Sequence, residues 1–258
     1  MGGLHQIAGE RRKSVREDVS VVRHKDRELI AQAQQIVADG FSDEASLYGA
    51  MSLGEYRDLI AATQDKINAA GYVRKIAHDL IDKLVEITGS DDLLVQANCY
   101  LRAARPNSSA TQETVDWHRE SFYGPSMERA LNVWTPIANV TPQNTLRYVP
   151  ASAAIPDSEI LIEQLDDTQT PRFSSGHKIG LLYSPKKIVG GIDLSHSQPM
   201  IVDERSSAIF SAQLIHGAAV NNAKTIRFSL DFRLTPKLAY RETKKHFAAG
   251  YQDFFVEL

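Results

Sequence analysis

The strongest constraint on the fold comes from a stretch near the end of the chain, T-I-R-F-S-L-D-F-R-L, residues 225–234. Apolar and polar side chains alternate along it, which is the pattern of a β-strand with one face in the core. The apolar face carries Phe228, Leu230, Phe232 and Leu234. The other face carries Arg227, Ser229, Asp231 and Arg233. We therefore expect a sheet that buries one face and presents charge on the other.

Several more short runs of this kind follow one another in the second part of the chain. Apolar or alternating segments occupy residues 93–101, 130–137, 146–149, 179–183, 208–215 and 226–234. Clusters of Pro, Gly, Asn and Ser separate them, as expected for turns. This pattern is typical of a β-sandwich, barrel or jelly roll. The long polar connection over residues 151–177 suits a rim or lid over a site.

The first third of the chain has a helical period instead. Ser52 followed by Glu55 forms a capping-box signal, and Gly71 offers a stop. Apolar spacing predicts helices over residues 27–38, 52–71 and 73–89. The prediction is therefore a mainly β fold with a helical N-terminal layer. We expect a single domain with a helical layer over 1–90, a β core over 91–236 and an extension over 237–258.

Composition narrows the possible partners. The 258 residues include 43% hydrophobic and 24% charged residues, enough for a full core, and the formal net charge is −3. A net negative charge does not favour nucleic acid or an anionic membrane. A lone Cys99, without a secretory signal or a long apolar run, predicts a cytoplasmic protein. The sequence leaves the oligomeric state open.

The stretch V-D-W-H-R-E-S-F-Y, residues 115–123, places His118 and Glu120 two positions apart. On a strand both side chains would point to one face. The pair is compatible with a metal site, an acid/base pair or a surface pair. A third metal ligand would be His216, which follows an apolar run and precedes a glycine, although a histidine in that position can equally close a core strand.

A hairpin would bring one arginine into this set. Arg227 follows His216 by eleven residues, and a turn through Asn221 and Asn222 could return it alongside. Two imidazoles and one carboxylate suit non-haem Fe(II), which keeps open coordination positions. A bound 2-oxoglutarate could fill two of these positions, and its far carboxylate would need a bidentate donor such as Arg227, supported by Ser229.

Four stretches together carry a resemblance to a known family. These are W-H-R-E, L-N-V-W-T-P-I, Q-N-T-L-R-Y-V-P-A-S, and L-I-H-G with R-F-S following. In this order the chain resembles, over about residues 93–236, the phytanoyl-CoA dioxygenase-like branch of the Fe(II)/2-oxoglutarate-dependent oxygenases. The resemblance implies a double-stranded β-helix, the cupin-like jelly roll. It also implies iron ligands His118, Glu120 and His216, with Arg227, Ser229 and Trp134 around the cofactor.

Two departures from the family pattern have consequences. The family usually has Pro-Gly-Ser-His where this chain has Pro150, Ala151, Ser152 and Ala153, so any role of that histidine is missing. The first carboxylate is Glu120 where Asp is commoner. Because it is a carboxylate, no position is left for chloride, which disfavours a halogenase.

The resemblance implies a function with Fe(II), 2-oxoglutarate and O2, most simply hydroxylation of a C–H bond. The chain also resembles, more loosely, dioxygenase-like proteins of antibiotic and sugar biosynthesis. We therefore expect a small polar substrate, such as a sugar, aminocyclitol or amino acid. Candidate substrate contacts are Gln96, Asn98, Tyr123 and Asn132, the last on the strand face of Trp134.

Two other functions use the same residues. A cupin-like metal isomerase or lyase could employ the two histidines and the glutamate, but it would leave Arg227 and Ser229 without a task. A non-catalytic binding protein could retain the fold. Elsewhere, we interpret Asp231 with Arg233 as a surface pair, and Arg102 with Arg105 as an exposed strand end.

Overall fold

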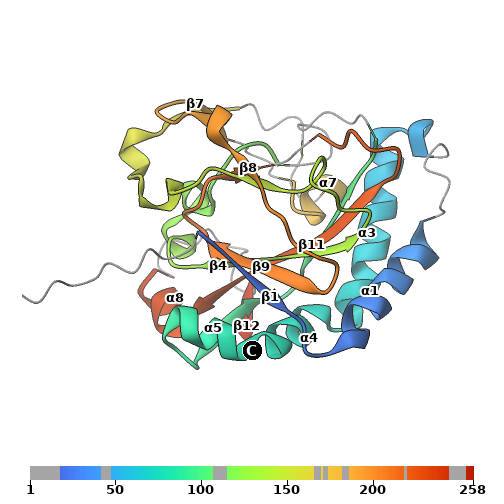
Figure 1. The fold of residues 1–258 in the computed structure, drawn as a ribbon, viewed down its shortest axis with the longest axis horizontal. Helices are drawn as coiled ribbons and strands as arrows, with labels where there is room; N and C mark the ends of the chain where they lie inside the picture. Colours follow the sequence, from blue (N-terminus) through green and yellow to red (C-terminus); the bar gives the residue numbers. More distant parts are fainter. Residues whose placement is uncertain are drawn as a thin grey trace, which may run out of the picture.

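The computed structural model describes residues 18–41, 48–106, 115–165, 170, 174–181, 186–217, 220–243 and 254–258. This part of the chain combines antiparallel β-sheet with helices that pack along one side of it (Figure 1). None of its helices is long and apolar enough to cross a membrane.

Within the described ranges, the largest sheet has seven strands. In spatial order they are β1 (Val19–Arg23), β9 (Ser206–Ser211), β4 (Leu131–Ala138), β11 (Arg227–Pro236), β2 (Leu93–Gln96) and β12 (Phe255–Glu257), with β3 (Tyr100–Ala104) also paired to β11. A second sheet contains β10 (His216–Gly217), β5 (Arg147–Tyr148) and β8 (Gln198–Pro199). A two-stranded ribbon is formed by β6 (Leu161–Gln164) and β7 (Lys186–Gly190).

Strand β11 lies at the centre of the largest sheet. It pairs with β4 along one edge and with β3 and β2 along the other. Its predicted apolar face is confirmed, because Phe228, Leu230, Phe232 and Leu234 all belong to the main hydrophobic core. The opposite face is buried too, so the expected surface pair of Asp231 and Arg233 is wrong: each is only 7% exposed.

The helices cover the apolar face of this sheet. They are α1 (Arg27–Gly40), α3 (Leu53–Ala69), α4 (Tyr72–Asp79) and α5 (Ile81–Thr88), with the shorter α7 (Ser175–Lys178) and α8 (Lys237–Thr243) elsewhere. Ser52 and Glu55 form the predicted capping box at the start of α3. The helix expected over 73–89 is instead broken at Leu80, whose backbone departs from the helical geometry at φ −95° and ψ 3°.

Helix α3 also protects the outer edge of β3. Gln64 Oε1 accepts from the amide of Leu101, and Asn68 Oδ1 accepts from the amide of Cys99. The Tyr56 hydroxyl donates to the carbonyl of Ala103. Side chains of the helix therefore take the place of a further strand.

The expected strand over 93–101 is divided into β2 and β3 by a bend at Ala97 and Asn98. Gln96 Nε2 donates to the carbonyl of Asn98, and the next amide, that of Cys99, turns to Asn68. These local bonds replace the continuous ladder that the apolar run predicted.

Two other expected strands are also shorter or absent. Within the run 208–215, strand β9 ends at Ser211. The amide of Ala212 donates to the carbonyl of Ala130, and the amide of Leu214 donates back to the carbonyl of Ser211, which forms a turn. Residues 179–181 form a turn, with Gly180 at φ +77°, while 182–183 lie outside the described residues. The carbonyls of this turn face Arg102 and not a neighbouring strand.

The expected hairpin between His216 and Arg227 is wrong. Strand β10 pairs with β5, while β11 pairs with other strands of the large sheet. Asn221 Nδ2 donates to the carbonyls of Ala104 and Thr225, which directs the connection to the end of β3. The segments expected as a purely helical layer and as an extension also contribute β1 and β12 to the sheet.

A buried hydrogen-bond chain ties the N-terminal strand to the sheet and to α4. His24 Nδ1 donates to Asp79 Oδ2 at 2.8 Å, and Nε2 lies 2.9 Å from the Ser207 hydroxyl. Ser207 in turn contacts the Thr135 hydroxyl at 2.6 Å. Serine, histidine and aspartate follow the order of a hydrolytic triad, but Ser207 is fully buried and outside the pocket described below, so the chain serves structure.

Replacing His24 tests this role. We expect His24→Ala to lower the free energy of unfolding by about 2–3 kcal/mol, because it leaves buried polar groups without a partner. The neighbouring Lys25→Ala removes only an exposed ion pair to Asp82 and should leave stability unchanged. Urea denaturation measures both; equal stability of parent and His24→Ala would contradict the structural role.

Candidate metal centre and adjoining pocket

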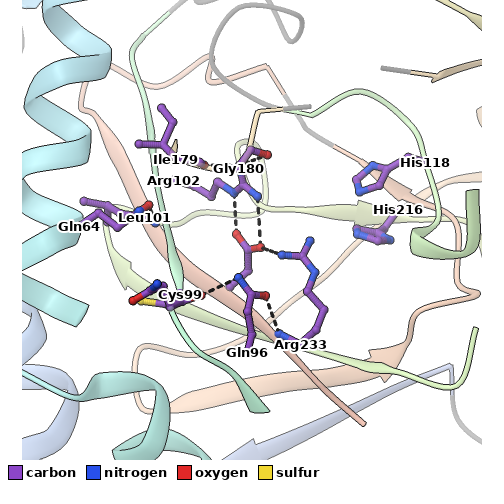
Figure 2. Close-up of polar contacts among 12 residues, drawn as sticks. Gln64, Gln96, Cys99, Leu101, Arg102, His118, Ile179, Gly180, His216 and Arg233 are labelled. Carbon is purple, nitrogen blue, oxygen red and sulfur yellow. Dashed lines mark hydrogen bonds and ion pairs between the residues drawn. The ribbon is translucent and has the colours of Figure 1, made fainter. Parts of the chain in front are cut away.

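The structure brings His118, Glu120 and His216 together. One ligand atom from each lies within 4.8 Å of the other two, and all three residues are buried. The main chains of the histidines pair directly, His118 N to His216 O at 2.9 Å and His216 N to His118 O at 3.0 Å. Figure 2 shows the two imidazoles side by side. Residues almost a hundred positions apart are therefore fixed by backbone bonds.

Glu120 reaches the histidines by a different route from the one expected. His118 is followed by an extended Arg119, and Glu120 then begins the 3-10 helix η1 (Glu120–Tyr123). The amide of Glu120 donates to the carbonyl of Ala212 at 2.9 Å. The turn after β9 thus positions the carboxylate, and the two side chains do not reach one face through the alternation of a regular strand.

Both imidazoles have one nitrogen occupied. His118 Nδ1 lies 2.7 Å from the carbonyl of Asp116, and His216 Nδ1 lies 2.9 Å from the carbonyl of Leu214. A carbonyl can only accept, so each Nδ1 carries a proton, and Nε2 is the nitrogen of each ring that is left to face a metal ion. The two Nε2 atoms lie 3.7 and 3.9 Å from Glu120 Oε1.

The charges at this centre follow from burial and close partners. Burial lowers the pKa of His216 to about 3, with nearby His118 acting in the same direction, so its imidazole is neutral at physiological pH. Burial alone would raise the pKa of Glu120. The guanidinium of Arg233 and the two imidazoles outweigh it and hold that pKa well below its usual range. Two imidazole Nε2 atoms and an ionised carboxylate form a donor set that fits a divalent transition-metal ion.

A network of buried charges surrounds Glu120. Arg233 donates to Glu120 Oε1 from Nε at 3.1 Å and from Nη2 at 2.5 Å, and to Asp231 Oδ2 from Nη1 at 2.8 Å. Arg102 also grips Asp231, from Nε at 2.6 Å and from Nη2 at 3.2 Å. Both guanidinium groups therefore donate to the same carboxylate, that of Asp231, and Figure 2 shows Arg102 and Arg233 close to each other. Arg102 is therefore an internal residue, contrary to the exposed position expected from the sequence.

A pocket adjoins this centre. It is lined by Arg102, Val115, His118, Asn132, Trp134, Leu146, Phe210, His216, Arg227, Asp231 and Arg233. The two histidines and Arg227 therefore face one space, although the hairpin expected to join them does not exist. Strand β11 supplies Arg227, Asp231 and Arg233 from alternate positions, which is the charged face that the sequence indicated.

Arg227 is the most unusual residue in this pocket. It is 2% exposed, and its Nε has no hydrogen-bond partner. Burial, followed by the charge of Arg102, lowers its pKa to about 10, so the guanidinium remains charged at neutral pH. Among the described residues, two more polar groups are buried without partners: the Asn132 Nδ2 amide, which lines the pocket, and the Ser229 hydroxyl, which lies on the same strand face but outside the pocket lining. Buried polar groups are rarely left unpaired, so these three point to a polar ligand.

The remaining predicted site residues have mixed outcomes. Trp134 and Asn132 line the pocket. The Tyr123 ring lies 6.3 Å from that of His118, and its hydroxyl is buried without a partner, but the residue does not line the pocket. Gln96 accepts from the amide of Arg233, and Asn98 is exposed in the bend after β2, so the structure places both outside the pocket.

Sequence reasoning missed Arg102, Asp231 and Arg233 as parts of the site. The signal was present, because Asp231 and Arg233 share the strand face of Arg227. Arg119, also missed, is 1% exposed and donates to the carbonyls of Ser152 and Ile155. It fastens the start of the expected lid segment to the loop that carries His118 and Glu120.

Comparisons with known proteins agree on the fold. No family model and no curated protein matches the sequence. Among solved structures, the chain is similar to the non-haem monooxygenase ThoJ in its apo form, with a TM-score of 0.54 and 18% identity over 93% of this chain and 80% of that one. It is also similar to EvdO2 from Micromonospora carbonacea var. aurantiaca, with a TM-score of 0.52 and 12% identity over 92% and 94% of the two chains. At these identities the likeness establishes a shared fold.

The unpaired charge of Arg227 leads to a prediction about stability. Replacing it by methionine removes a buried cation that forms no ion pair with the described residues, so we expect Arg227→Met to raise the free energy of unfolding by about 1–3 kcal/mol in the absence of ligands. Arg102→Met, which leaves Asp231 without its bidentate partner, should instead lower it by about 3–5 kcal/mol. Denaturant titration of both variants is the measurement. A large loss of stability in Arg227→Met would mean that its guanidinium has a partner within the protein.

Proposed function

We propose that this protein is a non-haem Fe(II)- and 2-oxoglutarate-dependent dioxygenase with a jelly-roll core, similar to the phytanoyl-CoA dioxygenase-like enzymes. The observation that carries the proposal is the buried guanidinium of Arg227, whose Nε has no hydrogen-bond partner among the described residues, in the same pocket as His118 and His216. A metal centre alone would not require this arginine. A bidentate anion that also reaches the metal does.

The donor set supports the metal. Two imidazole Nε2 atoms and one carboxylate oxygen lie within 4.8 Å of one another, and a set of three such ligands leaves coordination positions of an iron ion for other ligands. When bound there, Fe(II) with 2-oxoglutarate and O2 would supply the oxidising power for hydroxylation of a C–H bond, with succinate and CO2 as co-products. The hydrogen bonds to Asp116 and Leu214 hold the imidazoles in the tautomer that this role requires.

The far end of the pocket supports the choice of 2-oxoglutarate. The planar fork of Arg227 matches a carboxylate, and Ser229 adds a hydroxyl two positions along the same strand face. Trp134 forms a wall of the pocket. The protein's own contribution is to replace the water around the far carboxylate by these donors and to fix the oxoacid end towards the metal.

The pocket also supports a small, polar substrate. Because the same pocket must hold the co-substrate as well, a compact metabolite such as a sugar, aminocyclitol or amino acid is favoured. The unpartnered amide of Asn132 is the donor best placed to orient a substrate oxygen. A cupin-like isomerase or lyase would use the same metal ligands but would leave Arg227 and Ser229 unsatisfied.

Anaerobic titration with Fe(II) and 2-oxoglutarate tests the proposal. We expect a weak visible charge-transfer band in the parent and none in His216→Ala. In Arg227→Ala the band should require roughly 10- to 100-fold more 2-oxoglutarate, because hydrogen bonds to a charged group are lost. Metal binding without any band would reject 2-oxoglutarate as the co-substrate and favour the isomerase or lyase.

A further inference from the structure

We propose that Arg233 is a positioning residue of the metal centre, which holds the Glu120 carboxylate ready for the ion, and that Asp231 and Arg102 hold Arg233 in turn. This inference rests on the proposed metal site and adds the residues that organise it. It assigns a role to Arg102, Asp231 and Arg233, none of which is a proposed metal ligand or the proposed anchor of the far carboxylate.

Arg233 contacts the Glu120 carboxylate directly. Two nitrogens of the guanidinium converge on Oε1, from 3.1 Å and 2.5 Å. The same oxygen faces the Nε2 atoms of His118 and His216. A glutamate side chain has three rotatable bonds, and without this grip its carboxylate could leave the imidazoles. The guanidinium therefore fixes the carboxylate where the donor set requires it.

Arg233 is itself held from several sides. Its Nη1 donates to Asp231, and its backbone amide donates to Gln96 Oε1. The ring of Tyr100 lies under both guanidinium groups, with its centroid 5.4 Å from Arg233 and 5.0 Å from Arg102. The carboxylates of Glu120 and Asp231 and the ring of Tyr100 therefore restrict the guanidinium of Arg233, and the bond to Gln96 fixes its backbone.

Arg102 anchors the far end of the network. Arg102 Nη1 donates to the carbonyls of Ile179 at 3.0 Å and Gly180 at 3.2 Å (Figure 2). Gly180 packs so closely on Tyr100 that a Cβ added there would lie 2.6 Å from the ring. The network therefore runs from Glu120 through Arg233, Asp231 and Arg102 to a tightly packed turn, with alternating charges. Such outer contacts orient metal ligands.

Arg233 has two opposing effects on a metal ion, which can be separated by substitution. Its charge repels a cation, whereas its fork positions the ligand. Arg233→Lys keeps the charge and loses the planar fork, and Arg233→Met loses both. If positioning dominates, both variants bind metal more weakly. If repulsion dominates, Arg233→Met binds it more tightly.

Absorption titration with Co(II), which reports metal affinity without catalysis, provides the test. We expect about 10- to 100-fold weaker binding in Arg233→Lys and Arg233→Met, the range typical for outer contacts of metal ligands. The d–d bands should change shape in both, and Asp231→Asn should weaken binding in the same direction. Arg105→Lys is the matched control, because Arg105 is partly buried and donates to the carbonyls of Tyr48 and Met51, away from the centre.

The outcomes separate the two proposals. Circular dichroism first confirms which variants fold, and Asp231→Asn serves as the test if Arg233 variants do not. Unchanged or tighter Co(II) binding in the folded variants would overturn the positioning role while leaving the metal site intact. If His216→Ala binds Co(II) as well as the parent does, the metal site and the positioning role fall together.

Discussion

The structure depends on one costly arrangement, a central strand that is buried on both faces although one face is charged. β11 must pair on both edges to complete the sheet, and its even-numbered residues form the core against the helices. The odd-numbered residues then have no access to bulk water. Buried charges are tolerated only with partners, so the positions of Arg102, Glu120 and Gln96 follow from the needs of Asp231 and Arg233.

Along this face the charges are paired at one end and unpaired at the other. Near Glu120, each carboxylate meets a guanidinium, and the network is neutral by itself. Among the described residues, no ion pair is formed by Arg227, its Nε has no hydrogen-bond partner, and the Ser229 hydroxyl beside it also lacks a partner. A protein selected only for stability would not keep such a group, so its retention is best understood as preorganisation for an anion. The same strand thus carries the paired cluster beside Glu120 at one end and Arg227, the proposed anion anchor, at the other.

The sequence was informative where the pattern was local. The capping box at Ser52 and the alternation over 226–234 correctly predicted a helix start and a strand, because both depend on neighbouring residues. The trio of His118, Glu120 and His216 was identified from motifs. Its geometry was not, since Glu120 sits on a 3-10 turn and His216 pairs with β5 through contacts distant in sequence.

Errors arose where long-range contacts override local pattern. A run such as 93–101 looks like one strand until Asn68 of α3 bonds to its middle. Asp231 and Arg233 resemble a surface pair until the second sheet edge and the loop of Glu120 enclose them. Gln96 was predicted to contact the substrate from its place on a predicted strand. Its partner in the structure is the amide of Arg233, which residue spacing could not predict.

The most direct measurement of the central claim is anomalous diffraction at the iron edge from crystals grown anaerobically with Fe(II) and 2-oxoglutarate. The account predicts one peak within bonding distance of His118 Nε2, Glu120 and His216 Nε2. It also predicts the oxoacid end of 2-oxoglutarate on that ion and the far carboxylate on Arg227. A peak elsewhere in the protein, or a far carboxylate that does not reach Arg227, would contradict it.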